Sequence, residues 1–134
     1  MKATATMLQM LVRVCGVVLI TLGVLFWTSN ALDLVSVHML FGITLVLALW
    51  ALAILGARAG VPLGFVAFAL VWGLIVPALG LTQAALLPGG AHWVIQVLHL
   101  LVGLGAIGQA ENLATRIKRL TKPTTALPTT ASAR

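Results

Sequence analysis

Three histidines, His38, His92 and His99, are the residues of this sequence best suited to chemistry. Imidazole changes its charge near neutral pH, and either ring nitrogen can bind a proton or a metal ion. His38 and His99 lie within long apolar stretches of the chain. An ionisable side chain inside a membrane-spanning segment is rare and indicates a functional site. What these histidines do therefore depends on whether, and how, the apolar stretches cross a membrane.

The composition identifies lipid as the solvent of most of the chain. Of the 134 residues, 61% are hydrophobic and only 7% are charged, and the mean hydropathy is +1.16. A soluble domain averages about 25% charged residues, and a small protein has too much surface to hide so much apolar area from water. The apolar runs are unbroken, whereas barrel strands alternate apolar and polar residues. We therefore expect membrane-spanning helices.

Four apolar stretches are long enough to cross the hydrocarbon core, which requires about 20 residues per helix. The predicted spans are residues 8–27, 34–57, 61–81 and 92–112. The last helix is expected to continue as a basic amphipathic turn to residue 120, and Pro77 predicts a kink near Gly73. The expected fold is an all-α, four-helix transmembrane up-down bundle over residues 1–120. Residues 121–134 are rich in Thr, Pro and Ala and are expected to form a disordered cytoplasmic tail.

The distribution of positive charge predicts the orientation of the bundle. The loops at 28–33 and 82–90 contain no Lys or Arg, so the basic residues all fall on the side of the two termini. By the positive-inside rule, both termini are expected to be cytoplasmic in a bacterial-type plasma membrane. Trp27 and Trp93 would then lie at the outer interface, while Trp50 would lie deeper. The net charge of +6 thus indicates membrane topology and no nucleic-acid partner.

The two halves of the chain share a pattern of histidine and glycine. Gly42 follows His38 by four residues, and Gly103 follows His99 by four residues. The first and third spans each contain two glycines seven residues apart, which places each pair on one helix face. These pairs are Gly16 with Gly23 and Gly73 with Gly80. The pattern predicts an internal repeat of a two-helix hairpin.

The second and fourth spans run in the same direction and are diagonal partners in an up-down bundle. His38 and His99 are expected about 6 and 10 Å inside the outer ends of these spans, at similar depths. Two imidazoles that face each other at one level can ligate a haem iron axially. Glycines beside them would leave room for a flat macrocycle, although close helix packing is the alternative for each one. The glycines in question are Gly16, Gly23, Gly42, Gly73, Gly80 and Gly103.

In its four-span topology and in the positions of His38 and His99, the chain resembles small four-helix membrane-bound b-type cytochromes. In that family the second and fourth helices supply paired histidines to haem b. The resemblance implies one haem b near the outer face and a role in electron transfer, alone or as a subunit of a redox complex. Quinol or a periplasmic or extracellular electron carrier is the implied partner. The second histidine that two-haem members carry on each of these helices is absent here.

Other interpretations of the same residues remain open at this stage. His92 lies seven residues before His99 on the same face, so it competes with His99 as a ligand and could instead bond a propionate. His92, Gln96, His99 and His38 could also form a mononuclear metal site, although no cysteine pair or clear carboxylate completes it. A cofactor-free protein, such as a transporter or a scaffold subunit, would use its histidines for hydrogen bonds across the bundle. Homo-oligomerisation is possible with any of these.

Two charged residues have expected partners or positions. Glu111, near the inner end of the fourth span, is predicted to pair with Arg58 or Arg116. Arg13 is predicted to extend to the membrane surface with its charge in water.

A bis-histidine iron has no open coordination position, so outer-sphere electron transfer is favoured over an enzymatic reaction.

Overall fold

The computed structural model describes residues 1–122, which form four long helices and two short 3-10 helices. All four long helices are long and apolar enough to cross a membrane, and the described residues contain no strand. The all-helical, four-helix prediction is therefore confirmed, whereas most of the predicted tail, residues 123–134, lies outside the described part of the chain. In chain order the elements are α1 (Lys2–Trp27), η1 (Leu32–Leu34), α2 (Val35–Arg58), α3 (Leu63–Thr82), η2 (Gln83–Ala85) and α4 (His92–Leu120).

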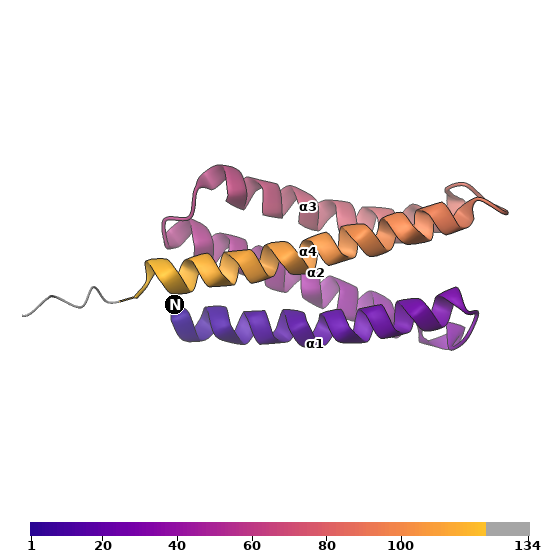
Figure 1. Cartoon of the computed structure of the whole chain (residues 1–134), viewed down its shortest axis with the longest axis horizontal. Helices are drawn as coiled ribbons and strands as arrows, with labels where there is room; N and C mark the ends of the chain where they lie inside the picture. Colours follow the sequence, from indigo (N-terminus) through magenta and orange to yellow (C-terminus); the bar gives the residue numbers. More distant parts are fainter. Residues whose placement is uncertain (123–134) are drawn as a thin grey trace, which may run out of the picture.

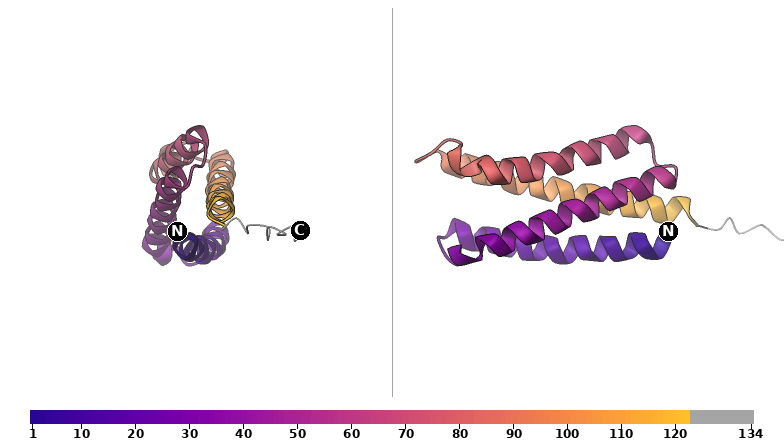
Figure 2. Two further views of the ribbon diagram at one scale, coloured as in Figure 1. Left: turned by 90° about the vertical axis from the view of Figure 1, so that its left-hand side faces the viewer. Right: turned by 180° about the vertical axis from the view of Figure 1, so that it is seen from behind.

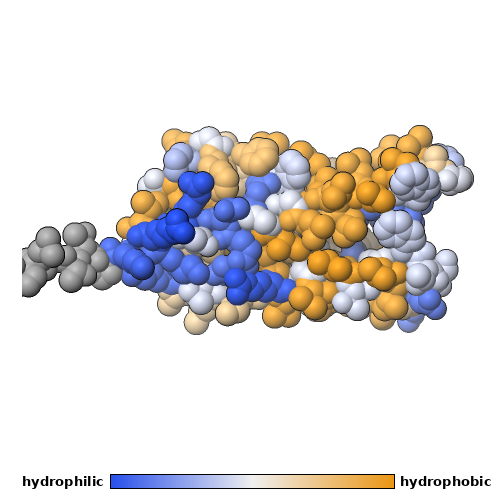
Figure 3. All heavy atoms as spheres, in the orientation of Figure 1, coloured by the Kyte–Doolittle hydropathy of each residue, from blue (hydrophilic) through white to orange (hydrophobic). Residues whose placement is uncertain are grey.

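Successive long helices alternate in direction, so the start of α1 and the end of α4 lie at the same end of the bundle (Figure 1). We call this end, which carries Arg58, Arg116 and Arg119, the basic end. The opposite end, where η1 and η2 lie, is called the histidine end. Polar residues gather at the basic end, and apolar side chains cover much of the remaining surface on this face (Figure 3).

Of the two diagonal helix pairs in the bundle, one is in contact and the other is not. Helices α2 and α4 pack directly against each other, and each also contacts both α1 and α3. Helices α1 and α3 do not touch. The end-on view in Figure 2 shows this arrangement. The expected diagonal relation of the two histidine-bearing helices thus becomes a direct helix–helix contact.

A glycine closes the turn between α2 and α3. Gly60 has φ +87°, a left-handed conformation that costs other residues energy. The Val61 amide donates to the Gly56 carbonyl oxygen at 2.9 Å, and the Gly60 amide donates to that of Ala57 at 3.2 Å. This pair of bonds is a Schellman motif. Pro62 then caps the start of α3, where its missing amide leaves no donor unpaired. Helix α3 runs on through Pro77.

Side-chain burial is concentrated toward the basic end. No residue of α2 before Leu45 is buried, and before Ala106 only Ile95 and Val102 of α4 are buried. Small residues between the helices allow their backbones to approach closely in the basic half. The five largest fully buried side chains all lie there: Leu49, Leu52, Leu113, Ile117 and Val12. The half that contains His38 and His99 is therefore more loosely packed.

Two tryptophans tie neighbouring helices together by the same arrangement. The Trp50 indole nitrogen donates to the Leu70 carbonyl oxygen at 3.2 Å, and that of Trp72 donates to the Val102 carbonyl oxygen at 2.9 Å. In both cases a glycine follows the acceptor by three residues and leaves room for the indole. These glycines are Gly73, beneath Trp50, and Gly105, beneath Trp72. The sequence predicted only that Trp50 lies deeper than Trp27 and Trp93, so these hydrogen bonds are a new feature.

The prediction for Glu111 is wrong: its partner is Arg13 of α1. The Arg13 guanidinium donates to the two Glu111 carboxylate oxygens at 2.7 and 2.9 Å. The Gln9 amide also donates to Glu111, and Lys118 donates to the Gln9 side-chain oxygen at 2.6 Å. Glu111 faces α1, whereas Arg116 lies five residues further along the helix, on another face. The Arg116 guanidinium lies 4.8 Å from the centre of the Phe65 ring on α3.

The close contact between the Trp50 indole and Gly73 gives a test of this packing. A methyl group at Gly73 would collide with the indole, whereas one at Gly64 of the same helix would meet no atom within 4 Å. Gly73→Ala is expected to destabilise the fold by about 1–3 kcal/mol, the usual cost of overpacking. Gly64→Ala should change stability by about 0.5 kcal/mol or less. Thermal unfolding in detergent, followed by circular dichroism, measures both variants. Equal melting temperatures of Gly73→Ala and Gly64→Ala would contradict the close contact between the Trp50 indole and Gly73.

Candidate functional site

The packing of α2 against α4 brings His38 and His99 together. His38 lies one turn into α2, and His99 lies two turns into α4. Their ring centres are 6.3 Å apart, and the ring planes are inclined by 44°. Both side chains are partly buried. The two residues singled out from the sequence are thus neighbours at one level of the bundle, supplied by two helices.

The other two long helices also contact this pair. On one side, the Phe26 ring of α1 meets His38 edge-on, with ring centres 5.4 Å apart and planes inclined by 60°. On the other side, Gly80 of α3 lies against His99, where an added Cβ would be 3.2 Å from the ring carbon Cε1. A larger residue at position 80 would push the imidazole aside. All four helices therefore contribute to the surroundings of the two rings.

Each ring has a buried nitrogen without a hydrogen-bond partner. Among the described residues, the buried side-chain atoms that lack a partner are Nδ1 of His38, Nδ1 of His99 and Oε1 of Gln109. A buried polar atom without a partner costs about 1–3 kcal/mol, and folded proteins leave few such atoms. Nδ1 of His38 and Nδ1 of His99 therefore remain available to a partner from outside the described residues.

The pair fits a metal centre held by two imidazoles. A metal–imidazole bond is about 2 Å long, which places the centres of two opposed ligand rings about 6 Å apart. The observed separation of 6.3 Å agrees with this distance. The looser packing around the pair is also compatible with a bulky group in that half of the bundle. The separation of the two rings is therefore compatible with the predicted arrangement of His38 and His99 around one metal ion, and haem binding stays a prediction.

His92 and Gln96, the other polar residues predicted for the site, lie nearer the start of α4. The His92 Nδ1 atom is 3.2 Å from the Leu86 carbonyl oxygen, in the connection between α3 and α4. Within residues 1–122 no three His, Cys, Asp or Glu side chains are close enough to hold a metal ion together. The mononuclear site of three or more ligands is therefore not assembled. His99, not His92, is the histidine that meets His38.

The predicted glycines differ in what surrounds them. Gly80 contacts His99, as described above, and Gly42 faces Leu19 at 3.9 Å. Gly23 and Gly103 have open space where a side chain would be. Two others are occupied by large neighbours, since an added Cβ would meet Ile107 at Gly16 and the Trp50 ring at Gly73. The structure therefore gives Gly16 and Gly73 a role in helix packing, and leaves the other four near open space or near His99.

The histidine end offers polar groups but no Lys or Arg side chain. No Lys or Arg occurs between Arg13 and Arg58, or between Arg58 and Arg116. The Asn30 amide donates to Thr28, and the Thr82 hydroxyl donates to the Ala78 carbonyl oxygen, so both side chains are already engaged. Acidic groups of a ligand bound here would find no basic partner and would have to reach the aqueous edge of the membrane.

Comparison of the chain with protein-family models, with curated proteins and with solved structures finds no match. The function must therefore be inferred from the chemistry of the residues themselves.

The contact between residues 38 and 99 can be tested without any cofactor. In a Cys15→Ser background, the pair His38→Cys and His99→Cys is expected to be joined readily by a short bifunctional thiol reagent. The control pair, His38→Cys with His92→Cys, should be joined at least about tenfold more slowly, because effective concentration falls steeply when a linker cannot span two sites. Mass spectrometry of the digested protein measures the cross-link. Faster joining of the control pair would contradict the site described here.

Proposed function

We propose that this protein is a single-haem membrane cytochrome of the b type, in which His38 and His99 would hold the haem iron. The observation that carries the proposal is the pair of neighbouring imidazoles on α2 and α4, with ring centres 6.3 Å apart and a buried nitrogen without a partner on each ring. When bound, haem would supply one-electron redox chemistry. The two histidines would hold the iron through neutral nitrogens and leave no coordination position for a substrate. The proposed activity is therefore electron transfer and not catalysis on a bound substrate.

The surrounding residues have supporting roles in this proposal. Phe26 packs against His38 and restricts the orientation of its ring. Gly80 allows His99 to lie close to α3, which restricts the second ring. The apolar helices around the pair would keep water away from the centre and thereby influence its reduction potential.

The distribution of basic residues supports an orientation of the bundle in the membrane and a place for electron exchange. We infer that the basic end, with Arg58, Arg116 and Arg119, faces the cytoplasm of a bacterial-type cell, by the positive-inside rule. The site would then lie near the outer face. Quinol in the membrane, or a periplasmic or extracellular carrier, could reach it there. With no second histidine pair, the chain would exchange electrons near one face, alone or as a subunit of a redox complex.

We also propose that the two hairpins, α1 with α2 and α3 with α4, derive from a repeated unit. Each ligand lies on the second helix of its hairpin, and a glycine follows each histidine by four residues. A duplicated hairpin would supply one ligand per copy, which explains why the two histidines belong to helices of the same direction.

The ligand assignment can be tested by absorption spectroscopy of the purified protein after expression with ample haem. The wild type is expected to show a reducible Soret band and a sharp α-band. His38→Ala and His99→Ala should each lower the affinity for haem by at least about tenfold, because losing a ligand costs no less than losing a residue that orients one. Added imidazole should restore part of the low-spin spectrum in either variant.

Matched controls separate loss of a ligand from loss of the fold. Gln96→Ala and His92→Ala change nearby polar residues of α4 and should keep the wild-type spectrum, and circular dichroism checks that every variant stays helical. A spectrum lost in His92→Ala and kept in His99→Ala would move the ligand to His92. A colourless wild-type protein would overturn the cytochrome proposal and favour a cofactor-free transporter or scaffold subunit.

The orientation has its own test in fusions to the C-terminus. In a bacterial host, green fluorescent protein at the C-terminus is expected to fluoresce, because it folds in the cytoplasm. Alkaline phosphatase at the same position should be inactive, because it needs the oxidising periplasm for its disulfides. Fusions truncated after Asn30 should give the opposite pair of results, because position 30 lies at the other end of the bundle. An active phosphatase at the C-terminus would reverse the proposed orientation.

A further inference from the structure

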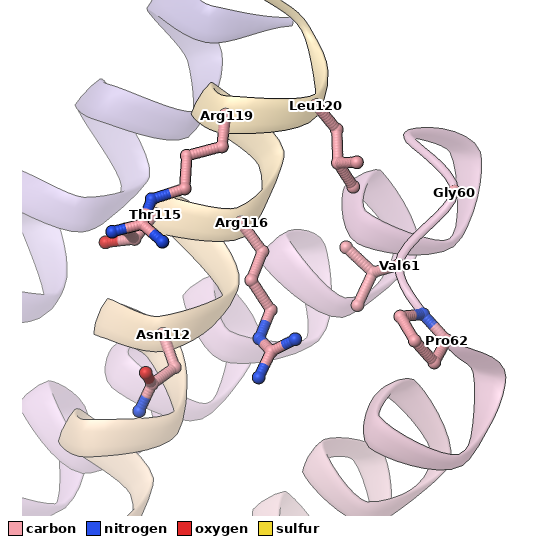
Figure 4. Close-up of a pocket in the computed structure, with 8 residues that line it drawn as sticks. All are labelled: Gly60, Val61, Pro62, Asn112, Thr115, Arg116, Arg119 and Leu120. Atoms are coloured by element: carbon pink, nitrogen blue, oxygen red, sulfur yellow. The ribbon is translucent and has the colours of Figure 1, made fainter.

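A second site candidate lies at the basic end, far along the bundle from the histidines. The turn between α2 and α3 and the last turns of α4 enclose a hollow of about 390 Å³. Figure 4 shows its residues: the Arg116 side chain runs back along α4 from its C-terminal end, and the Arg119 guanidinium group lies beside Thr115, on the side of α4 away from Val61 and Pro62. The lining residues are Gly60, Val61, Pro62, Asn112, Thr115, Arg116, Arg119 and Leu120.

The two arginines in this hollow have no acidic partner. The whole sequence contains only two acidic side chains, Asp33 and Glu111. Asp33 lies in η1 at the histidine end, and Glu111 forms its ion pair with Arg13. In residues 1–122, this is the one ion pair between side chains. The positive charge of the hollow is therefore not neutralised by a side chain of the described part.

The surroundings of the guanidinium groups suit a ligand that is both anionic and partly apolar. Arg116 is held in place by the Phe65 ring, 4.8 Å from its guanidinium carbon. Thr115 adds a hydroxyl group beside Arg119 (Figure 4). The opposite wall is the apolar Val61–Pro62 turn, which the Schellman motif at Gly60 fixes rigidly. Basic pockets between transmembrane helices are typical sites for phospholipid headgroups.

We propose that this hollow binds a phosphate group, with Arg116 and Arg119 as its anchors. Guanidinium groups bind phosphate oxygens through paired, charge-assisted hydrogen bonds, and they keep their charge at any physiological pH. Two sources carry this chemistry, the headgroup of an anionic phospholipid and a soluble phosphate. The proposal does not depend on the haem site, because no residue is shared between the two.

Native mass spectrometry of the full-length protein in detergent tests the proposal. The protein is mixed with phosphatidylglycerol, with a neutral galactosyl diacylglycerol that has no phosphate, or with inorganic phosphate as a competitor of phosphatidylglycerol. The wild type is expected to retain phosphatidylglycerol in preference to the galactolipid. The double variant R116Q/R119Q should bind it about thirtyfold more weakly, because it loses the charge-assisted hydrogen bonds of both guanidinium groups to the phosphate.

The matched control is R58Q/K122Q, which removes the same number of charges from the basic end but none from the hollow. It should change the affinity by about threefold or less. R116K/R119K keeps the charge and loses the paired geometry, so an intermediate affinity is expected; it also guards against misfolding of the glutamine variant.

The outcomes separate the two sources of phosphate. Preferential retention of phosphatidylglycerol that inorganic phosphate does not displace supports a lipid headgroup. Displacement by inorganic phosphate at millimolar concentration supports a soluble phosphate in the same site. Equal retention of both lipids by the wild type, or an equal loss in R58Q/K122Q, would overturn the proposal and leave only diffuse attraction to the basic end.

Discussion

The structure depends on one constraint: lipid offers no hydrogen bonds, so every polar group within the bundle needs a partner inside it. The chain meets this constraint in two ways. The indoles of Trp50 and Trp72 donate to backbone oxygens of the next helix. Gln9 and Glu111 satisfy each other together with Arg13 and Lys118. Among the described residues, Gln109 and the two neighbouring imidazoles each keep a buried atom without a partner, and the pairing of His38 with His99 makes the imidazoles the candidate binding site.

The tightly packed core and the candidate site lie in different halves of the bundle. Toward the basic end, alanines and glycines let the helices approach, and the large buried side chains interlock there. Toward the histidine end few side chains are buried, so a ligand could enter at a smaller cost in lost contacts. A bundle that was tightly packed along its whole length would have no room for a macrocycle. Concentrating the stabilising contacts in one half allows the other half to be adapted to a function.

The charged side chains also differ between the two halves of the bundle. With only two acidic side chains in the whole sequence, most of the basic residues must find their counter-ions outside the chain. The single acid of α4, Glu111, is used to join the first and last helices, which the sequence separates by about 100 residues. The arginines that remain at the basic end face the region where phospholipid headgroups lie in the proposed orientation. The electron-transfer site and the phosphate site would then lie near opposite faces of the membrane.

The sequence by itself determined the four helices, since hydropathy and length are local properties that a bilayer reads directly. The predicted spans agree with the helices to within a few residues, except that α1 begins at Lys2, six residues before the predicted start at residue 8, because polar residues can extend a helix beyond the hydrocarbon core. The turn at Gly60 was equally local, as was the similar depth of His38 and His99. Tertiary structure decided which faces meet. The pairing of Arg13 with Glu111, the indole bonds to α3 and α4, and the filling of the space beside Gly16 and Gly73 all depend on helix rotation. In a chain apolar on every side, hydropathy does not fix that rotation, and only side-chain packing does.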